Sequence, residues 1–196
     1  MWNEQIIMML LEGIKDTLYM TLTSTLIGYV IGLPMGILLT VTDKDGIHPN
    51  AAVYKVLDVI ANLIRSVPFL ILLIVLIPFT RFLIGRSYGP TATIVPLVIA
   101  AAPYIARMVE SSLKEVDAGV IEAARSMGAS NFTIVTKVML VEARTSLIVG
   151  ATISLGTILG YSAMAGTVGG GGLGDIAIRY GYTRWQTDIM IVTVIL

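Results

Sequence analysis

Long apolar runs separated by short polar connections dominate the chain. The clearest run covers 20–41, and its interruptions are small residues, hydroxyl residues and one proline, all of which membrane helices tolerate. Further runs cover 57–80, 91–109 and 147–168, and about 20 apolar residues at 1.5 Å each are enough to cross a bilayer. A fifth run at 189–196 is too short to cross, so we expect its natural helix to continue beyond this sequence. The pattern predicts an all-α, polytopic bundle with five transmembrane helices.

Composition supports a membrane protein and excludes several kinds of site. Hydrophobic residues make up 56% of the 196 positions and charged residues 13%, about half the usual quarter. So short a soluble chain cannot bury this much apolar surface, which makes the bilayer the expected solvent. The formal net charge is +0, which gives no reason to expect nucleic acid as a partner. Cysteine is absent, which excludes disulfides and zinc–thiolate sites, and the apolar runs contain no metal-ligand cluster or catalytic triad.

The distribution of Lys and Arg among the connections predicts the orientation. The start of the chain lacks the basic region and cleavage site of a signal peptide, so the first apolar run is expected to stay in the membrane. One side of the predicted membrane has eight basic residues: Lys44, Lys55, Arg65, Arg107, Lys114, Arg125, Lys137 and Arg144. The other side has five: Lys15, Arg81, Arg86, Arg179 and Arg184. Because Lys and Arg favour the cytoplasmic side, the N-terminus is predicted outside. Residues 1–16 then form an extracytoplasmic or interfacial segment, 17–196 the membrane domain, and 110–146 a cytoplasmic connection.

This cytoplasmic connection is the longest polar one, and its pattern predicts two short helices. Asp117 can cap the first helix, and Gly128 stands where a helix ends in a left-handed residue. Ser130 or Asn131 can cap a second helix, predicted at 132–140. The apolar faces are expected to contain Val120, Ile121 and Ala124 in the first helix and Phe132, Val135, Val138 and Met139 in the second. From these residues alone, the segment is either a solvated loop or a compact knob that docks into a groove of another protein.

The same segment carries a family resemblance. Glu122, Ala123, Ala124 and Gly128 form the E-A-A-x-x-x-G signature of the inner-membrane subunits of ABC importers. That family continues with I-x-L-P, where this chain has 138–141 with valine in place of the final proline. Further stretches are similar to the methionine-import ABC permeases over nearly the whole chain: NLIRSVPFLILL, IPFTRFLIG, IVPLVIAAAPYIARMVE and GYSAMAGTVGGGGLGDIAIRYGY.

The resemblance implies a five-span type I importer permease in the bacterial inner membrane. It implies a homodimer around a shared pathway, two copies of a separate ATPase that uses ATP and Mg²⁺, and a substrate-binding lipoprotein that delivers methionine from outside. This chain would itself bind no cofactor and catalyse no reaction. The helix within 117–131 would enter a groove of the ATPase, with the coupling residues Glu122, Ala123, Ala124, Arg125 and Gly128. Three positions apart, Glu122 and Arg125 can also form an ion pair. An importer for another amino acid or small solute is the alternative within the class.

Glycine spacing and polar patches mark candidate packing and pathway positions. Small residues recur every four positions in the first and fourth runs, at Gly28, Gly32 and Gly36 and at Gly156 and Gly160. This spacing predicts close helix packing in lipid, or a contact between two permease copies. The candidate pathway or gate residues are two prolines and a polar, polarizable patch: Pro68, Pro103, Tyr161, Ser162 and Met164. Plain kinks and ordinary packing are the alternatives for these five residues.

Two motifs and one further class were weighed against this interpretation. Residues 169–174 satisfy G-x-G-x-x-G, but no strand precedes them, so a turn with positive φ is expected rather than a dinucleotide site. Residues 172–175 match the G-x-G-D of intramembrane aspartyl proteases, whose chemistry requires a second carboxylate beside Asp175. A self-standing channel or carrier would need ionisable residues deep in the spans, whereas Asp58 and Arg65 lie near one end.

Overall fold

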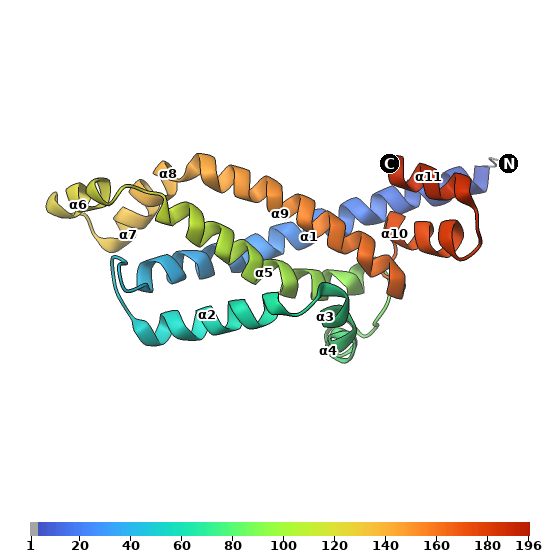
Figure 1. The fold of residues 1–196 in the computed structure, drawn as a ribbon, viewed down its shortest axis with the longest axis horizontal. Coiled ribbons are helices and arrows are strands. Elements are labelled where there is room, and N and C mark those ends of the chain that lie inside the picture. Colours follow the sequence, from blue (N-terminus) through green and yellow to red (C-terminus); the bar gives the residue numbers. More distant parts are fainter. Residues whose placement is uncertain (1–3) are drawn as a thin grey trace. The chain divides into compact units, whose positions relative to one another are not determined.

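The structure is a computed structural model that describes residues 4–196 (Figure 1). The longest helices are α1 (Glu4–Thr42), α2 (Ala51–Ser66), α5 (Pro90–Lys114) and α9 (Arg144–Ala165). The shorter α-helices are α3 (Phe69–Val75), α4 (Ile77–Ile84), α6 (Ala118–Ser126), α7 (Asn131–Thr133), α8 (Leu140–Glu142), α10 (Gly172–Ile176) and α11 (Thr187–Ile195). Two π-helical stretches, η1 (Ile134–Met139) and η3 (Ala177–Tyr182), and one 3₁₀ turn, η2 (Gly166–Val168), complete the described chain. No strand occurs among these residues, which confirms the predicted all-α class.

Three helical stretches are long and apolar enough to cross a membrane: Glu4–Thr42, Pro90–Lys114 and Arg144–Tyr182, the last of which contains α9. The pair α2 and α3 passes the same test as a broken span. The runs predicted to span at 20–41, 91–109 and 147–168 fall inside these three stretches. Helix α11 covers most of the short run at 189–196.

Two boundaries differ from the sequence prediction. Helix α1 continues without a break from Glu4 to Thr42, so residues 4–16 belong to the same helix as the first span; residues 1–3 lie outside the described part. The Glu and Lys residues near its start do not break the helix, because both are good helix formers. The run 57–80 is not one helix, because α2 ends at Ser66 and α3 begins at Phe69. Between them Pro68 has an extended backbone with φ −55° and ψ 132°; it lacks an N–H and disfavours helix in the preceding residue.

The helices divide between two compact units. Among the described residues, unit 1 contains 4–26, Val67–Ala100 and Leu155–Leu196, and unit 2 contains Ile27–Ser66 and Ala101–Ser154. Each unit therefore combines sections that are distant in the sequence. The connection 110–146, predicted to be cytoplasmic, belongs to unit 2.

In unit 2, α1 packs against α5 through a row of glycines. A Cβ atom added to Gly32 would lie 2.7 Å from the Ala102 carbonyl oxygen and 2.8 Å from the Ile105 Cβ atom. A Cβ atom on Gly36 would lie 2.7 Å from the Val109 Cβ atom. Real Cβ atoms do not approach this closely, so the absence of a side chain permits the near contact of the two helices. Such contacts supply packing where lipid provides no hydrophobic drive between helices.

In unit 1, the backbone of the glycine-rich turn after α9 is hydrogen-bonded to other parts of the unit. The Leu173 N–H donates to Thr17 Oγ1 of α1 at 2.9 Å, and the Gly89 N–H donates to the Gly169 carbonyl at 2.9 Å. Thr93 Oγ1 of α5 lies 3.3 Å from the Gly170 carbonyl, to which it donates. The turn is therefore part of the folded unit rather than a free surface loop.

Candidate functional site

Local capping rules determine the corner of the connection 110–146. Asp117 caps α6, since its Oδ1 accepts the Gly119 N–H at 2.7 Å. After α6 the chain turns at Gly128, whose φ is +81°. The Gly128 N–H donates to the Arg125 carbonyl at 3.0 Å and the Ala129 N–H to the Ala124 carbonyl at 3.1 Å, which satisfies carbonyls at the helix end. Both the predicted Asp117 cap and the predicted left-handed Gly128 are confirmed.

The second helical stretch is wound differently from the prediction. Ser130 is its cap, because its Oγ accepts the Thr133 N–H at 3.3 Å; of the two predicted caps, Ser130 is the correct one. The stretch begins at Asn131 and includes the π-helical η1. Of the predicted apolar face, Val135 and Met139 are buried, and Ile134 is buried with them. Phe132, in α7 before the π-helical stretch, is 77% exposed.

The predicted coupling residues differ in their access to a partner. Glu122, Ala123 and Arg125 are exposed, whereas Ala124 is 5% exposed and packs inward. Two apolar side chains beside the Gly128 corner are far more exposed: Met127 at 82% and Phe132 at 77%. Sequence reasoning did not include them in the site. The available signal was the presence of large apolar residues on both sides of a polar turn.

Arg125 connects α6 to the turn that follows α1. Its Nη2 donates to the Ile47 carbonyl at 2.9 Å, so the predicted pair between Glu122 and Arg125 is replaced by this bond. The turn and α6 border an open cavity of about 800 Å³, which Leu113, Ile121 and other side chains of unit 2 also line. Thus α6 borders an open cavity and is not packed against the rest of unit 2 along its whole length.

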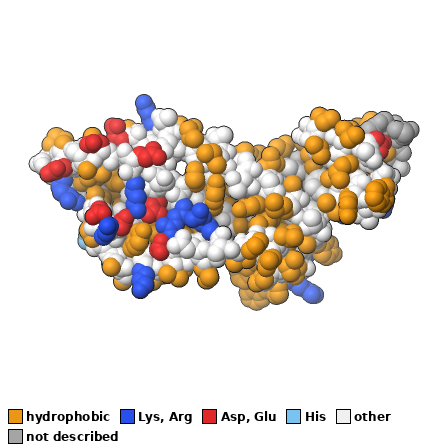
Figure 2. Space-filling model, viewed as in Figure 1, with side chains coloured by type: hydrophobic (Ala, Val, Ile, Leu, Met, Phe, Trp, Pro, Cys, Tyr) orange, Lys and Arg blue, Asp and Glu red, His pale blue; other side chains and the backbone are white. Residues whose placement is uncertain are grey.

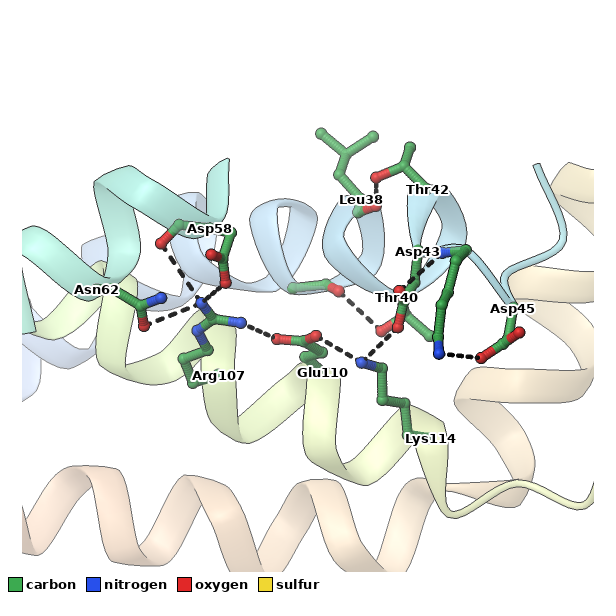
Figure 3. Close-up of polar contacts among 12 residues, drawn as sticks. Leu38, Thr40, Thr42, Asp43, Asp45, Asp58, Asn62, Arg107, Glu110 and Lys114 are labelled. Atoms are coloured by element: carbon green, nitrogen blue, oxygen red, sulfur yellow. Dashed lines mark hydrogen bonds and ion pairs between the residues drawn. The ribbon is translucent and has the colours of Figure 1, made fainter. Parts of the chain in front are cut away.

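A chain of charged side chains lies next to this cavity, and sequence reasoning missed it (Figure 3). Glu110 of α5 accepts from two cations, Arg107 Nη1 at 2.6 Å and Lys114 Nζ at 2.8 Å. Arg107 also pairs with Asp58 of α2, and Lys114 Nζ lies 2.7 Å from Asp43 Oδ2 in the turn after α1. The hydrogen bond from Lys114 holds the pKa of Asp43 below its ordinary 3.8, although burial opposes this shift. Figure 2 shows acidic and basic side chains gathered in this part of unit 2.

The candidate pathway residues of unit 1 make specific contacts. The Tyr161 ring stacks on Phe69, with centroids 4.4 Å apart. Ser162 is 1% exposed, donates to the Leu159 carbonyl at 2.8 Å and accepts a long 3.5 Å bond from Thr21. Met164 is 50% exposed. The stack brings α9 against the start of α3, and Met164 remains accessible.

The remaining candidate positions fall in different places. Pro68 is the exposed residue before α3 in unit 1, and Pro103 is buried in α5 in unit 2. A Cβ atom on Gly156 or Gly160 would meet no atom of the described chain within 4 Å. These two glycines of α9 therefore differ from those of α1, which touch another helix of the same chain.

The glycine-rich turn has the backbone that its composition predicts. Gly169, Gly171 and Gly172 have φ values of +79°, +84° and +75°. Residues that carry a side chain rarely adopt such values. Asp175 forms an ion pair with Arg179 one helical turn later. Its partner is therefore a cation, whereas an aspartyl protease dyad requires a second carboxylate.

Comparison with known proteins identifies the class. A sequence model of the family "Binding-protein-dependent transport system inner membrane component" matches residues 9–196, and the chain belongs to this family. It is 47% identical to the probable D-methionine transport system permease protein MetI of Vibrio cholerae serotype O1, over 96% of this chain and 84% of that protein. It is 51% identical to the D-methionine transport system permease protein MetI of Escherichia coli K12, over 84% and 76% of the two chains.

Solved structures give the same class. The chain matches an inward-facing structure of the MetNI methionine ABC transporter with a TM-score of 0.96 and 48% identity, over 99% of this chain and 90% of that chain. A structure of an amino acid ABC transporter with histidines matches with a TM-score of 0.78 and 23% identity, a likeness that concerns the fold alone. The predicted resemblance to ABC importer permeases and the predicted type I permease fold are confirmed.

Proposed function

We propose that this chain is the permease subunit of an ATP-driven ABC importer for methionine. The observation that carries the proposal is similarity to methionine permeases along nearly the whole chain, at 47% identity over 96% of its length for the Vibrio cholerae relative. The capped α6 and its Gly128 corner, at the E-A-A-x-x-x-G signature, support the same function. An importer for another amino acid or small solute remains the alternative that the substrate test below distinguishes.

The proposed assembly has two permease copies and two copies of a separate ATPase, to which ATP and Mg²⁺ bind. A substrate-binding lipoprotein delivers methionine on the outer side of the bacterial inner membrane. The proposed orientation places the N-terminus outside and 110–146 in the cytoplasm, as the eight-to-five division of basic residues supports. The charged surface of unit 2, where these residues gather, then faces the ATPase.

In this assembly α6 enters a groove of the ATPase. An exposed tip, formed by Met127 and Phe132 beside Gly128, makes the main apolar contact. Met127 and Phe132 are 82% and 77% exposed, and the rigid corner at Gly128 presents them together. Exposed aromatic and thioether side chains are common anchors of protein interfaces. Around this tip, Glu122, Ala123 and Arg125 supply polar and small contacts, while Ala124 supports the helix from inside. Closure of the ATPase pair would then move the helices attached to both ends of the connection.

We assign candidate pathway residues to unit 1 and a separate helix kink to unit 2. Tyr161, Ser162 and Met164 of α9 form a polar and polarizable patch that suits a thioether substrate, with Pro68 beside the stacked Phe69. Pro103 is proposed as a kink of α5. Gly156 and Gly160 lack neighbours within 4 Å in the described chain, and this open surface suits close approach of the second permease copy.

Complementation tests the substrate. The chain, expressed with its own ATPase and binding lipoprotein, should restore methionine uptake to a bacterial strain that requires methionine and lacks its own importer. Growth at low methionine concentration and uptake of labelled methionine are the measurements. A strain that takes up a different amino acid but not methionine would assign the chain to the alternative importer, and a strain that takes up neither would contradict the proposal.

A further inference from the structure

Unit 2 contains five charged side chains that alternate in sign along one continuous line (Figure 3). In order they are Asp58, Arg107, Glu110, Lys114 and Asp43. They come from three elements: α2, the last turns of α5, and the turn that follows α1. Neighbouring members of this charge chain are joined by direct ion pairs, so it links the three elements side by side.

The centre of the charge chain is the least exposed part. The side chain of Glu110 is 7% exposed and that of Arg107 is 17% exposed, whereas Lys114 is 43% exposed and Asp58, at one end, is 31% exposed. Arg107 also donates to Asn62 Oδ1 of α2 at 3.0 Å. A buried charge that loses its partner is strongly unfavourable. The members therefore hold one another in place, and the middle of α2 is fixed to the last turns of α5.

The outer end of the charge chain reaches the element that holds α6. Asp43 and Ile47 belong to one folded turn, in which the Gly46 N–H donates to the Asp43 carbonyl at 2.9 Å and the His48 N–H to the Val41 carbonyl at 3.0 Å. Arg125 of α6 is bound to the Ile47 carbonyl of that turn. A displacement of α6 consequently acts on the turn, and through Asp43 on the charge chain.

We infer that the charge chain is the element that carries movement of α6 to α1, α2 and α5 together. This inference rests on the proposed function, in which the ATPase moves α6. Its five members are positioning residues for transport: they make α2, the last turns of α5 and the turn after α1 respond as one body. Without the central charge, α6 moves while α2 and α5 no longer follow it in step. ATP is then hydrolysed with little transport.

The test measures methionine molecules imported per ATP hydrolysed, using the complete permease–ATPase complex in liposomes with its binding lipoprotein. We expect Glu110→Gln and Asp58→Asn to keep binding-protein-stimulated ATP hydrolysis and to lower this ratio about tenfold, within the roughly 5- to 150-fold range of coupling between sites. The matched control is Asp45→Asn, which changes the charge equally in the same turn. Asp45 is 83% exposed and lies 3.7 Å from Lys44, outside the charge chain, so its ratio should equal that of the wild type.

A purely structural role gives a different result. It predicts a lower melting temperature or yield for Glu110→Gln with an unchanged ratio of methionine to ATP, and that result overturns the inference. If Glu110→Gln does not assemble, Asp58→Asn and Asp43→Asn decide, because these side chains are 31% and 18% exposed. Their normal ratio equally overturns the inference. Failure of the wild-type complex to import methionine instead defeats the proposed function.

Discussion

The glycine row between α1 and α5 makes a quantitative prediction for Gly32→Ala. The added methyl group would lie 2.7 Å from the Ala102 carbonyl oxygen and 2.8 Å from the Ile105 Cβ atom. Neither atom is the end of a flexible side chain, so the helices themselves must separate. Overpacking of this kind typically costs about 1–3 kcal/mol, and the better helix propensity of alanine returns about 0.5–1 kcal/mol.

The net effect of Gly32→Ala is a destabilisation of about 0.5–2 kcal/mol, from the difference between the lower and between the upper ends of these two ranges. For a chain of this size, 1 kcal/mol corresponds to about 2–4 °C in melting temperature, so we expect a fall of about 1–8 °C. Thermal unfolding of the purified protein in detergent, followed by tryptophan fluorescence, measures it. The matched control is Gly150→Ala in α9 of the same unit, where the nearest atom is Met108 Cε at an ordinary 3.5 Å.

This control should melt at or slightly above the wild-type temperature, because only helix propensity changes. The reasoning is refuted if Gly32→Ala melts as high as Gly150→Ala. Such a result would mean that α1 and α5 can move apart without loss of stability, and that close packing does not explain the glycines.

Three further predictions concern the connection 110–146 and the charge chain of unit 2. Gly128→Val should uncouple ATP hydrolysis from transport, while Gly128→Asn retains coupling. An added Cβ atom would have space, since no atom of the described residues lies within 4 Å of it, but the φ of +81° is unfavourable for β-branched residues and tolerated by Asn. Equal coupling ratios in the two variants would contradict this. Phe132→Ala should weaken binding of the ATPase by at least about fivefold, corresponding to about 1 kcal/mol for an interface anchor, and Val141→Ala should not; titration of detergent-solubilised permease with ATPase measures both affinities. Asp43→Asn should lower the melting temperature near pH 7 by at most about 2–4 °C, since a pair with partly exposed Lys114 contributes up to about 1 kcal/mol. Because the pKa of Asp43 is depressed in the folded state, its contribution to stability is fully present at pH values above the ordinary pKa of 3.8 and is lost as the pH falls through the lower pKa of the folded state. A difference in melting temperature between Asp43→Asn and the wild type that persists in strong acid would contradict the assignment.

Features set by neighbouring residues could be predicted from the sequence. Asp117 and Gly128 follow from capping and backbone rules that act within one helical turn, and both are found in place. The glycine row on α1 follows from a four-residue spacing that places small residues on one helix face. The break before Phe69 was visible as Pro68, but its effect was interpreted as a bend within one span rather than as the end of α2.

Features set by long-range packing could not be predicted. Arg107 was assigned to a cytoplasmic connection, and nothing in its own neighbourhood indicates that its partner Asp58 lies 49 positions earlier. Likewise, Arg125 has a suitable partner three positions away, yet it binds the Ile47 carbonyl 78 positions away. The π-helical winding of η1 directly after Phe132 is another feature of which helical periodicity gives no warning.

Methionine uptake by the reconstituted complex tests the central claim most directly. The permease and its ATPase are placed in liposomes that contain ATP and Mg²⁺, and the binding lipoprotein and labelled methionine are added outside. We predict accumulation of methionine that requires both ATP and the binding lipoprotein, and that is lost in Gly128→Val although ATP hydrolysis continues. Accumulation without ATP, or ATP-dependent accumulation of a different solute with none of methionine, would contradict the account.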